Sequence, residues 1–265
     1  MSIKLKYLGV GSVVGTMLSS TAFADLFEYQ VNELILKAND RYEIPFTGES
    51  SREKGLIYTF QHASAWKYGD NYGFLDRYEL DETGEDLYGE FYANFSLGKM
   101  TGRPIRFGPI SDVGILAGYN WGRDTKVRKY LPGVRLSWDL PQFAFLNTDF
   151  TLYLDDNAGA DRGGVPEEDD SYMIDINWAA PFDIGRHRFS IEGHVEYIGQ
   201  QENEFGDKVS WWVLAQPQFR YDLGKTWFNK ADRLFVGVEW QYWKNKLGDP
   251  DTDENILQAI VVGRL

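Results

Sequence analysis

The chain is dominated by strand-length runs in which apolar and polar side chains alternate. In residues 189–197, for example, the apolar side chains take odd positions, while Glu192, His194 and Glu196 lie between them. Successive side chains on a strand point to opposite faces, so such a run predicts a strand with one apolar and one polar face. Twelve runs of this kind follow one another, at residues 28–38, 55–64, 70–79, 86–97, 112–121, 130–139, 146–156, 170–179, 187–198, 209–221, 231–243 and 255–265.

The length of these runs separates two all-β folds. A soluble β-sandwich gives the same alternation, but its strands usually contain about 5 or 6 residues. A tilted strand needs roughly 9 to 11 residues to cross a bilayer, and most of the runs are close to that length. Aromatic residues make up 16% of the chain, although hydrophobic residues make up only 43%. Aromatic girdles around a polar lumen produce this combination, so we predict an all-β, 12-stranded antiparallel transmembrane β-barrel.

Residues 1–24 have the layout of a secretory signal peptide. Lys4 and Lys6 precede an uncharged stretch at residues 7–18, and Ala24 completes a small-x-small cleavage site. A buried N-terminal helix is the alternative. We therefore expect residues 25–265 to form a single barrel domain in the bacterial outer membrane.

Several classes of function lack support in the sequence. The formal net charge of -13 argues against nucleic-acid binding, and the absence of cysteine removes thiol chemistry and thiolate metal sites. No G-x-S-x-G or H-E-x-x-H motif is present, and His62 and Ser64 share a strand face without a strained nucleophile turn. The acidic run from Asp249 lacks the Gly and Glu that an EF-hand loop requires. We therefore predict no enzyme, no cofactor and no dedicated metal site, although acidic loops could hold cations loosely.

The polar faces of the runs predict a wet lumen. Its candidate lining and substrate residues are Tyr88, Glu90, Tyr92, Asn94, Arg135, Asp149, Tyr153, Asp175, Glu192, Glu196, Arg220 and Glu239. Carboxylates outnumber cations in this set, which favours cations or neutral polar solutes over anions. The tyrosines offer flat faces on which a sugar or a nucleobase can stack.

The connections between the runs differ in charge from one end of the barrel to the other. With a periplasmic N-terminus, the outer loops fall near 39–54, 79–86, 122–129, 157–169, 199–208 and 244–254, and most are acidic. The connections at the other end carry Lys67, Lys99, Arg103, Arg106, Lys225 and Lys230.

Residues 62–76, HASAWKYGDNYGFLD, resemble the hallmark motif of the OmpK and Tsx group of outer-membrane proteins. The motif residues are His62, Ala63, Ser64, Trp66, Lys67, Tyr68, Gly69, Asp70, Asn71 and Asp76. Residues 87–122 also resemble this family, with a Glu-bearing strand, a Ser-Leu-x-Lys-x-Thr turn and an FGP segment. The resemblance implies a twelve-stranded barrel, nucleoside uptake as in the Tsx branch, or use as a phage receptor as in the OmpK branch.

Two hypotheses follow for function. The first is a passive channel for nucleosides or similar small polar solutes, surrounded by outer-membrane lipid and lipopolysaccharide. The alternative is a surface or structural barrel whose acidic outer loops serve as a bacteriophage receptor or a cation-binding surface.

Overall fold

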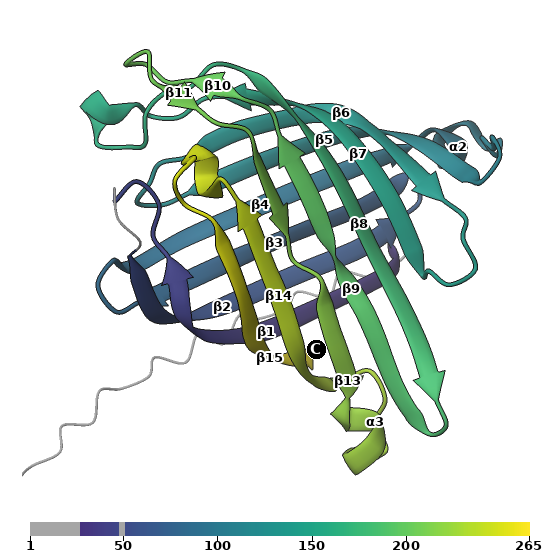
Figure 1. The fold of residues 1–265 in the computed structure, drawn as a ribbon. Helices are drawn as coiled ribbons and strands as arrows, with labels where there is room; N and C mark the ends of the chain where they lie inside the picture. Colours follow the sequence, from purple (N-terminus) through teal and green to yellow (C-terminus); the bar gives the residue numbers. More distant parts are fainter. Residues whose placement is uncertain (1–26, 48–50) are drawn as a thin grey trace, which may run out of the picture.

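The computed structural model describes residues 27–47 and 51–265 (Figure 1). The signal peptide predicted at residues 1–24 lies outside the described residues. The strands that build the main sheet are β1 (Phe27–Glu43), β2 (Arg52–Trp66), β3 (Gly69–Leu80), β4 (Gly84–Ser96), β5 (Ile110–Gly122), β6 (Arg128–Trp138), β7 (Phe145–Asp155), β8 (Ser171–Ile184), β9 (His187–Ile198), β12 (Trp212–Ala215), β13 (Gln218–Asp222), β14 (Leu234–Lys244) and β15 (Glu254–Arg264).

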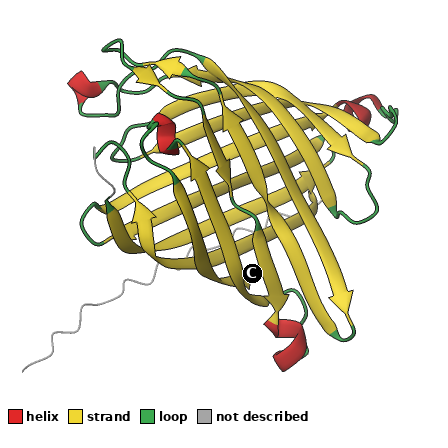
Figure 2. Cartoon of the chain, in the orientation of Figure 1, coloured by secondary structure: helices red, strands yellow, loops and turns green. Residues whose placement is uncertain are grey.

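These strands close into a barrel (Figure 2). Apart from β12 and β13, each of these strands pairs antiparallel with the next one along the chain, and the first strand, β1, pairs with the last, β15, over Glu33–Arg264 to Ala38–Ala259. Both β12 and β13 pair with β9 on one side and with β14 on the other, so they are two halves of a single barrel strand. The predicted 12-stranded antiparallel barrel is therefore confirmed.

The predicted run at 209–221 is wrong in its first part. Lys208–Val209 forms β11, which pairs with β10 (Gln201–Glu202) in a separate hairpin above the barrel. The barrel strand begins only at Trp212 and is interrupted at residues 216–217. Pro217 has no N–H to donate to the ladder, which explains the interruption.

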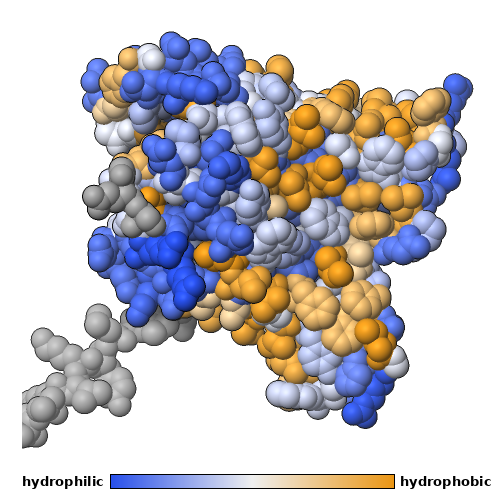
Figure 3. Space-filling model, in the orientation of Figure 1, coloured by the Kyte–Doolittle hydropathy of each residue, from blue (hydrophilic) through white to orange (hydrophobic). Residues whose placement is uncertain are grey.

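The outward and inward faces of the barrel have opposite character. Large apolar side chains face outward, including Phe91, which is 50% exposed, and Leu257, which is 66% exposed. Figure 3 shows apolar residues gathered over the strands, with hydrophilic residues around β10 and β11. Charged side chains such as Glu33 and Arg220 are buried inside. A soluble sandwich would have the reverse arrangement, so the structure excludes that alternative.

The two ends of the barrel carry different connections. The long-loop end holds residues 156–170, 199–211 and 245–253, with the short helices η1 (Ala160–Arg162) and η2 (Lys246–Gly248). The terminal end holds Phe27 and Arg264 and the helices α2 (Leu97–Thr101) and α3 (Leu223–Phe228). None of the helices among the described residues combines the length and apolar character needed to cross a bilayer.

The β2–β3 turn and α2 contact each other at the terminal end. The Nζ of Lys99 donates to the carbonyl oxygen of Trp66 at 2.9 Å, and the Trp66 ring meets the Tyr68 ring edge-on with centroids 5.6 Å apart. A Cβ at Gly69 would lie 1.7 Å from the carbonyl oxygen of Asn94, so this position requires glycine. The two segments that carry the family resemblance are therefore parts of one local structure.

Candidate functional site

The predicted lining residues all lie on inward faces of the barrel strands. They come from β4 (Tyr88, Glu90, Tyr92, Asn94), β6 (Arg135), β7 (Asp149, Tyr153), β8 (Asp175), β9 (Glu192, Glu196), β13 (Arg220) and β14 (Glu239). Eight of the twelve lie on two surfaces of the lumen, together with residues that sequence reasoning missed. The other four, Asn94, Arg135, Asp149 and Tyr153, lie outside both surfaces.

We call the first surface the compensated wall. It consists of charged and amide residues on β1, β9, β13, β14 and β15, namely Glu33, Lys37, Glu192, Gln218, Arg220, Glu239, Gln258 and Arg264. The Arg220 guanidinium lies 3.0 Å from the Glu33 carboxylate and 3.1 Å from that of Glu192. The Arg264 guanidinium lies 2.7 Å from the same Glu33 carboxylate. Glu33 is therefore shared between two arginines.

Glu239 occupies the centre of the compensated wall. Its carboxylate lies 3.4 Å from the Nζ of Lys37 and accepts hydrogen bonds from the side-chain amides of Gln218 and Gln258. Glu33 and Glu239 are each 1% exposed and Arg220 is 2% exposed. Because burying an unpaired charge is costly, such burial requires the pairing that is observed here. This side of the lumen is filled by a closed network.

The second surface, the acidic wall, consists of Tyr88, Glu90, Tyr92, Asn120, Asp175, His194 and Glu196, on β4, β5, β8 and β9. Glu90 accepts hydrogen bonds from the hydroxyls of Tyr88 at 2.6 Å and Tyr92 at 2.8 Å, and from the Asn120 amide at 3.1 Å. Its partners are thus neutral donors, and no residue of 27–47 or 51–265 forms an ion pair with it. The carboxylate is therefore held in place by neutral donors and not by a cation.

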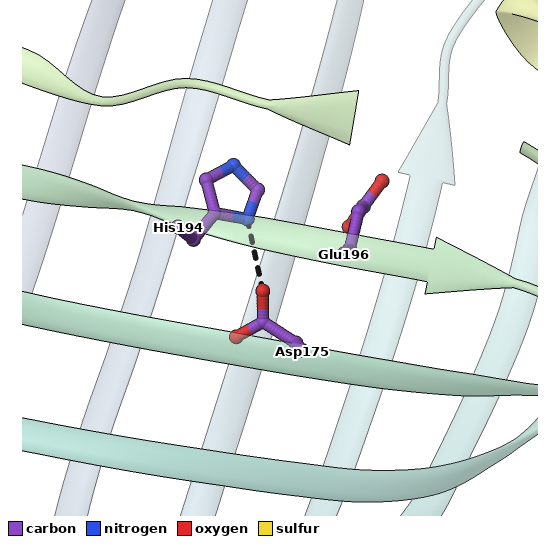
Figure 4. Close-up of side chains that lie close together, drawn as sticks. All are labelled: Asp175, His194 and Glu196. Carbon is purple, nitrogen blue, oxygen red and sulfur yellow. Dashed lines mark hydrogen bonds and ion pairs between the residues drawn. The ribbon is translucent and has the colours of Figure 1, made fainter. Parts of the chain in front are cut away.

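Asp175, His194 and Glu196 form the other half of the acidic wall (Figure 4). The Nδ1 of His194 lies 3.1 Å from the Asp175 carboxylate, which also accepts from the Asn177 amide at 2.7 Å. Asp175 and Glu196 are direct cross-strand partners of β8 and β9. Within the described part of the chain, the Glu196 carboxylate has no hydrogen bond and no ion pair.

Arg135 stands between the acidic wall and the terminal end. It forms a bidentate pair with Asp149, at 2.7 Å from each nitrogen, and its third nitrogen lies 2.7 Å from Asp70. Asp70 also accepts from the Asn94 amide at 2.7 Å. One residue of the hallmark motif therefore lies inside the barrel and fixes a lumen arginine.

The other hallmark residues have different positions. Asp76 also points inward and accepts a hydrogen bond from Thr59. His62 and Ser64 lie on the outward face, where the His62 ring bonds Asn32 at 2.8 Å and Ser64 at 3.1 Å. Most of the motif thus builds the terminal rim and does not line the lumen.

An apolar cluster lies inside the lumen, and sequence reasoning found only its two tyrosines, Tyr92 and Tyr153. Its buried members are Tyr92, Leu116, Leu131, Tyr153, Met173, Ile198, Val209 and Trp212. A signal for two of them exists, because Met173 is in phase with Asp175, and Ile198 with Glu196. His194 and Asn120 were also absent from the predicted set. His194 shares a face of β9 with Glu192 and Glu196, whereas Asn120, on β5, is the cross-strand partner of Glu90.

Four residues of the acidic wall are less buried than Glu33, Arg220 and Glu239 of the compensated wall. Tyr88, Glu90, His194 and Glu196 are half-buried, although they point into the barrel. An inward side chain reaches solvent only where the lumen leaves room for water. These four side chains are therefore the inward groups of the acidic wall that solvent reaches.

Comparison with known proteins gives one curated relative. No protein-family model matches the sequence. The chain is 24% identical over 186 residues to the outer membrane protein OmpK of Vibrio parahaemolyticus, and the match covers 68% of this chain. The resemblance to OmpK is confirmed. The aligned region spans 65% of the length of OmpK, slightly less than two thirds.

A solved structure agrees on the fold. The NanC porin superposes with a TM-score of 0.51 at 12% sequence identity, covering 87% of this chain and 98% of NanC. With identity this low, the likeness concerns the fold alone. Together with the similarity to OmpK and the outward apolar surface, it identifies the chain as a barrel protein of the bacterial outer membrane.

Proposed function

We propose that this protein is a passive outer-membrane channel for small polar solutes, with nucleosides as the preferred class. The observation that carries the proposal is that Tyr88, Glu90, His194 and Glu196 point into the barrel and are only half-buried, whereas the paired charges of the compensated wall, Glu33, Arg220 and Glu239, are buried. A lumen used only for structural packing would need no carboxylates that lack an ion-pair partner, as Glu90 and Glu196 do among the described residues.

The charge of the acidic wall favours some solutes over others. The carboxylates of Glu90, Asp175 and Glu196 point into the barrel, with one imidazole, that of His194, beside them. Such a wall repels anions and admits cations and neutral molecules.

Nucleosides fit the acidic wall because they combine a flat ring with several hydroxyl groups. The Tyr88 ring is half-buried on the lumen side, and its hydroxyl group is held by Glu90. Stacking of a base on such a ring is worth roughly 1 to 3 kcal/mol in open nucleic-acid sites. The Glu90 carboxylate retains acceptor capacity for a sugar hydroxyl.

Planar-bilayer recording tests the channel. We expect ion conductance from the purified barrel and concentration-dependent block by a nucleoside, with weaker block by a nucleoside monophosphate because of its charge. Absence of conductance from protein with heat-modifiable gel mobility would overturn the proposal.

Variants of Tyr88 test whether a nucleoside base stacks on the ring of this residue inside the channel. Tyr88→Leu removes the ring and should weaken nucleoside block about tenfold, the equivalent of one stacking contact. Tyr88→Phe keeps the ring and should change block much less. Tyr130→Leu, on the outward face where Tyr130 is 48% exposed, is the matched control and should leave block unchanged. Equal block by all three variants would remove Tyr88 from the path.

A surface-receptor function has separate support at the long-loop end. Residues 156–170 and 199–211 are joined by a bridge between Glu168 and Asn203 and by a bond from the Ala160 N–H to Glu204. An ordered surface of this kind suits recognition by a phage. Deletion of residues 203–207 should abolish phage adsorption and preserve conductance if the receptor function holds.

A further inference from the structure

We propose that Asp175, His194 and Glu196 form a binding site for one divalent first-row transition ion, with Zn²⁺ as the representative ion. One nitrogen of His194 and one oxygen of each carboxylate all lie within 4.8 Å of one another. One imidazole and two carboxylates are donors that such ions accept, at about 2.0 to 2.2 Å. This inference stands apart from the proposed transport of nucleosides.

The strands position the three ligands without any loop. Asp175 on β8 is paired directly with Glu196 on β9, so their side chains share a face of the sheet. His194 is two residues before Glu196 and points to the same side (Figure 4). The resulting group lies on a rigid sheet wall, where small rotations of side chains are sufficient to converge on an ion.

The distances suit a shared ion. His194 Nδ1 and the nearer Asp175 oxygen are 3.1 Å apart. Two ligands bound at about 2.1 Å to one ion lie roughly 3.0 to 3.5 Å apart at the angles such ions prefer. A bound ion would take the place of the hydrogen bond between these two atoms, and Glu196 would rotate toward it.

Glu196 is the second observation in favour of the site. Among the described residues its carboxylate has no hydrogen-bond or ion-pair partner, whereas the carboxylates of the compensated wall all have cationic partners. Glu90, on β4, is a further carboxylate of the same wall. A divalent cation would neutralise this excess.

A chain of amides determines which nitrogen of His194 faces the carboxylates. Glu254 is a carboxylate bound to Lys246 at 2.8 Å, so it accepts from the amide NH₂ of Gln241. The Gln241 oxygen then accepts from the Gln216 NH₂ at 2.7 Å, which leaves the Gln216 oxygen 3.0 Å from His194 Nε2.

An amide oxygen only accepts, so Nε2 carries a hydrogen. Nδ1, which donates to the Asp175 carboxylate, is then the nitrogen that would bind a metal once its proton is released to solvent. Hydrogen bonding of the distal nitrogen in this way is the usual support for a metal-bound histidine. The three protein ligands leave a position open toward the lumen for water.

Calorimetry with untagged barrel in detergent tests the site directly. We expect one Zn²⁺ per chain, and at least about tenfold weaker binding in His194→Gln and in Glu196→Gln. Gln216→Leu, which removes the support of Nε2, should weaken binding by about tenfold or more. His62→Gln removes a histidine far from any of the three ligands and is the matched control, expected to bind as wild type.

In calorimetry, the absence of Zn²⁺ uptake by the wild type would overturn the proposal. So would uptake that is unchanged in both His194→Gln and Glu196→Gln, because the ions would then be held at the acidic loops. Heat-modifiable gel mobility checks that each variant folds. Electron paramagnetic resonance of Cu²⁺ bound to the wild type supplies a readout that needs no variant. Coupling to one imidazole nitrogen is expected, and its absence would also reject the site. Neither measurement depends on conductance.

Discussion

The two walls of the lumen contain the same kinds of charged residue but use them differently. On the compensated wall, Glu33 and Glu239 are buried and paired with Arg220, Arg264 and Lys37. On the acidic wall, Glu90 is bound by neutral donors and Glu196 has no bonded partner among the described residues. The difference teaches that pairing accompanies burial: paired carboxylates fill the barrel, and unpaired carboxylates remain where solvent reaches them.

Arg135 lies outside both walls and gives the largest expected effect, because it is the cation that pairs with the buried Asp149. Arg135→Gln leaves Asp149 buried, with no ion-pair partner in the described structure and with the Asn177 amide as its remaining donor. We expect a loss of about 3 to 5 kcal/mol in the free energy of unfolding, which is usual when one partner of a buried pair is removed. Urea unfolding in detergent, followed by tryptophan fluorescence, measures it. A loss below about 1 kcal/mol would mean that water already screens this pair.

The corresponding change on the compensated wall should cost less. In Arg220→Gln, Glu33 keeps its contact with Arg264, and Glu192, which loses its ion pair, is partly exposed. We therefore expect a loss of about 2 kcal/mol, smaller than for a fully buried carboxylate left without any cation. The same unfolding assay compares the two variants. A double variant, Arg220→Gln with Arg264→Gln, removes both cations and should then cost more than the sum of its parts. Simple additivity would contradict the shared role of Glu33.

Neutralising the acidic wall should affect permeation and leave stability almost unchanged. In Glu90→Gln with Glu196→Gln, we expect the cation-over-anion permeability ratio to fall about fivefold, equivalent to about 1 kcal/mol of ion energy. Reversal potentials in a salt gradient measure this ratio. Asp207→Asn, which removes one charge from an exposed loop, is the control and should change the ratio little. An equal fall in both proteins would assign selectivity to the loops.

The smallest expected effect concerns Asp249, in the loop that joins β14 to β15 at the long-loop end. Burial raises the pKa of Asp249, but the N–H groups of Phe46 and Asp251 and the Thr252 hydroxyl donate to the carboxylate and lower its pKa overall. With a folded-state pKa below the unfolded value of about 3.9, the contribution is present at neutral pH and is lost as the pH falls through the folded pKa.

We therefore expect faster hydrogen exchange at Phe46 in strong acid, and already at neutral pH in Asp249→Asn, with a cost of about 1 kcal/mol. The amide of Val127, in the loop between β5 and β6, is the control and should exchange at the wild-type rate in the variant. Exchange at Phe46 that is the same at neutral pH in the variant and the wild type would contradict this account.

The strands and their faces were predictable from the sequence because a period of two is a local property. The run at 187–198 has the bounds of β9, and the other runs overlap the barrel strands to within a few residues, apart from the start of the run at 209–221. The break at Pro217 could have been noticed, since proline cannot complete the ladder of an internal strand.

The partners across the lumen could not be predicted. Arg135 meets Asp70, 65 residues earlier, only because the number of strands and the register of the closed sheet bring β3 and β6 within reach. The free carboxylate of Glu196 has the same origin, since its isolation depends on which cations other strands present. The inward apolar residues Met173 and Ile198 were overlooked because the lumen was assumed to be uniformly polar.

The contact of Arg264 with Glu33 has a consequence for assembly. It joins the last barrel strand to the first, at the same seam where the Leu265 N–H donates to the Asn32 carbonyl oxygen. Until β15 pairs with β1, the compensated wall lacks the guanidinium of Arg264 beside Glu33. Closure of the seam supplies that cation together with the β1–β15 ladder. The final step of insertion therefore completes the sheet and the charge balance at once, which favours the closed barrel over partly inserted forms.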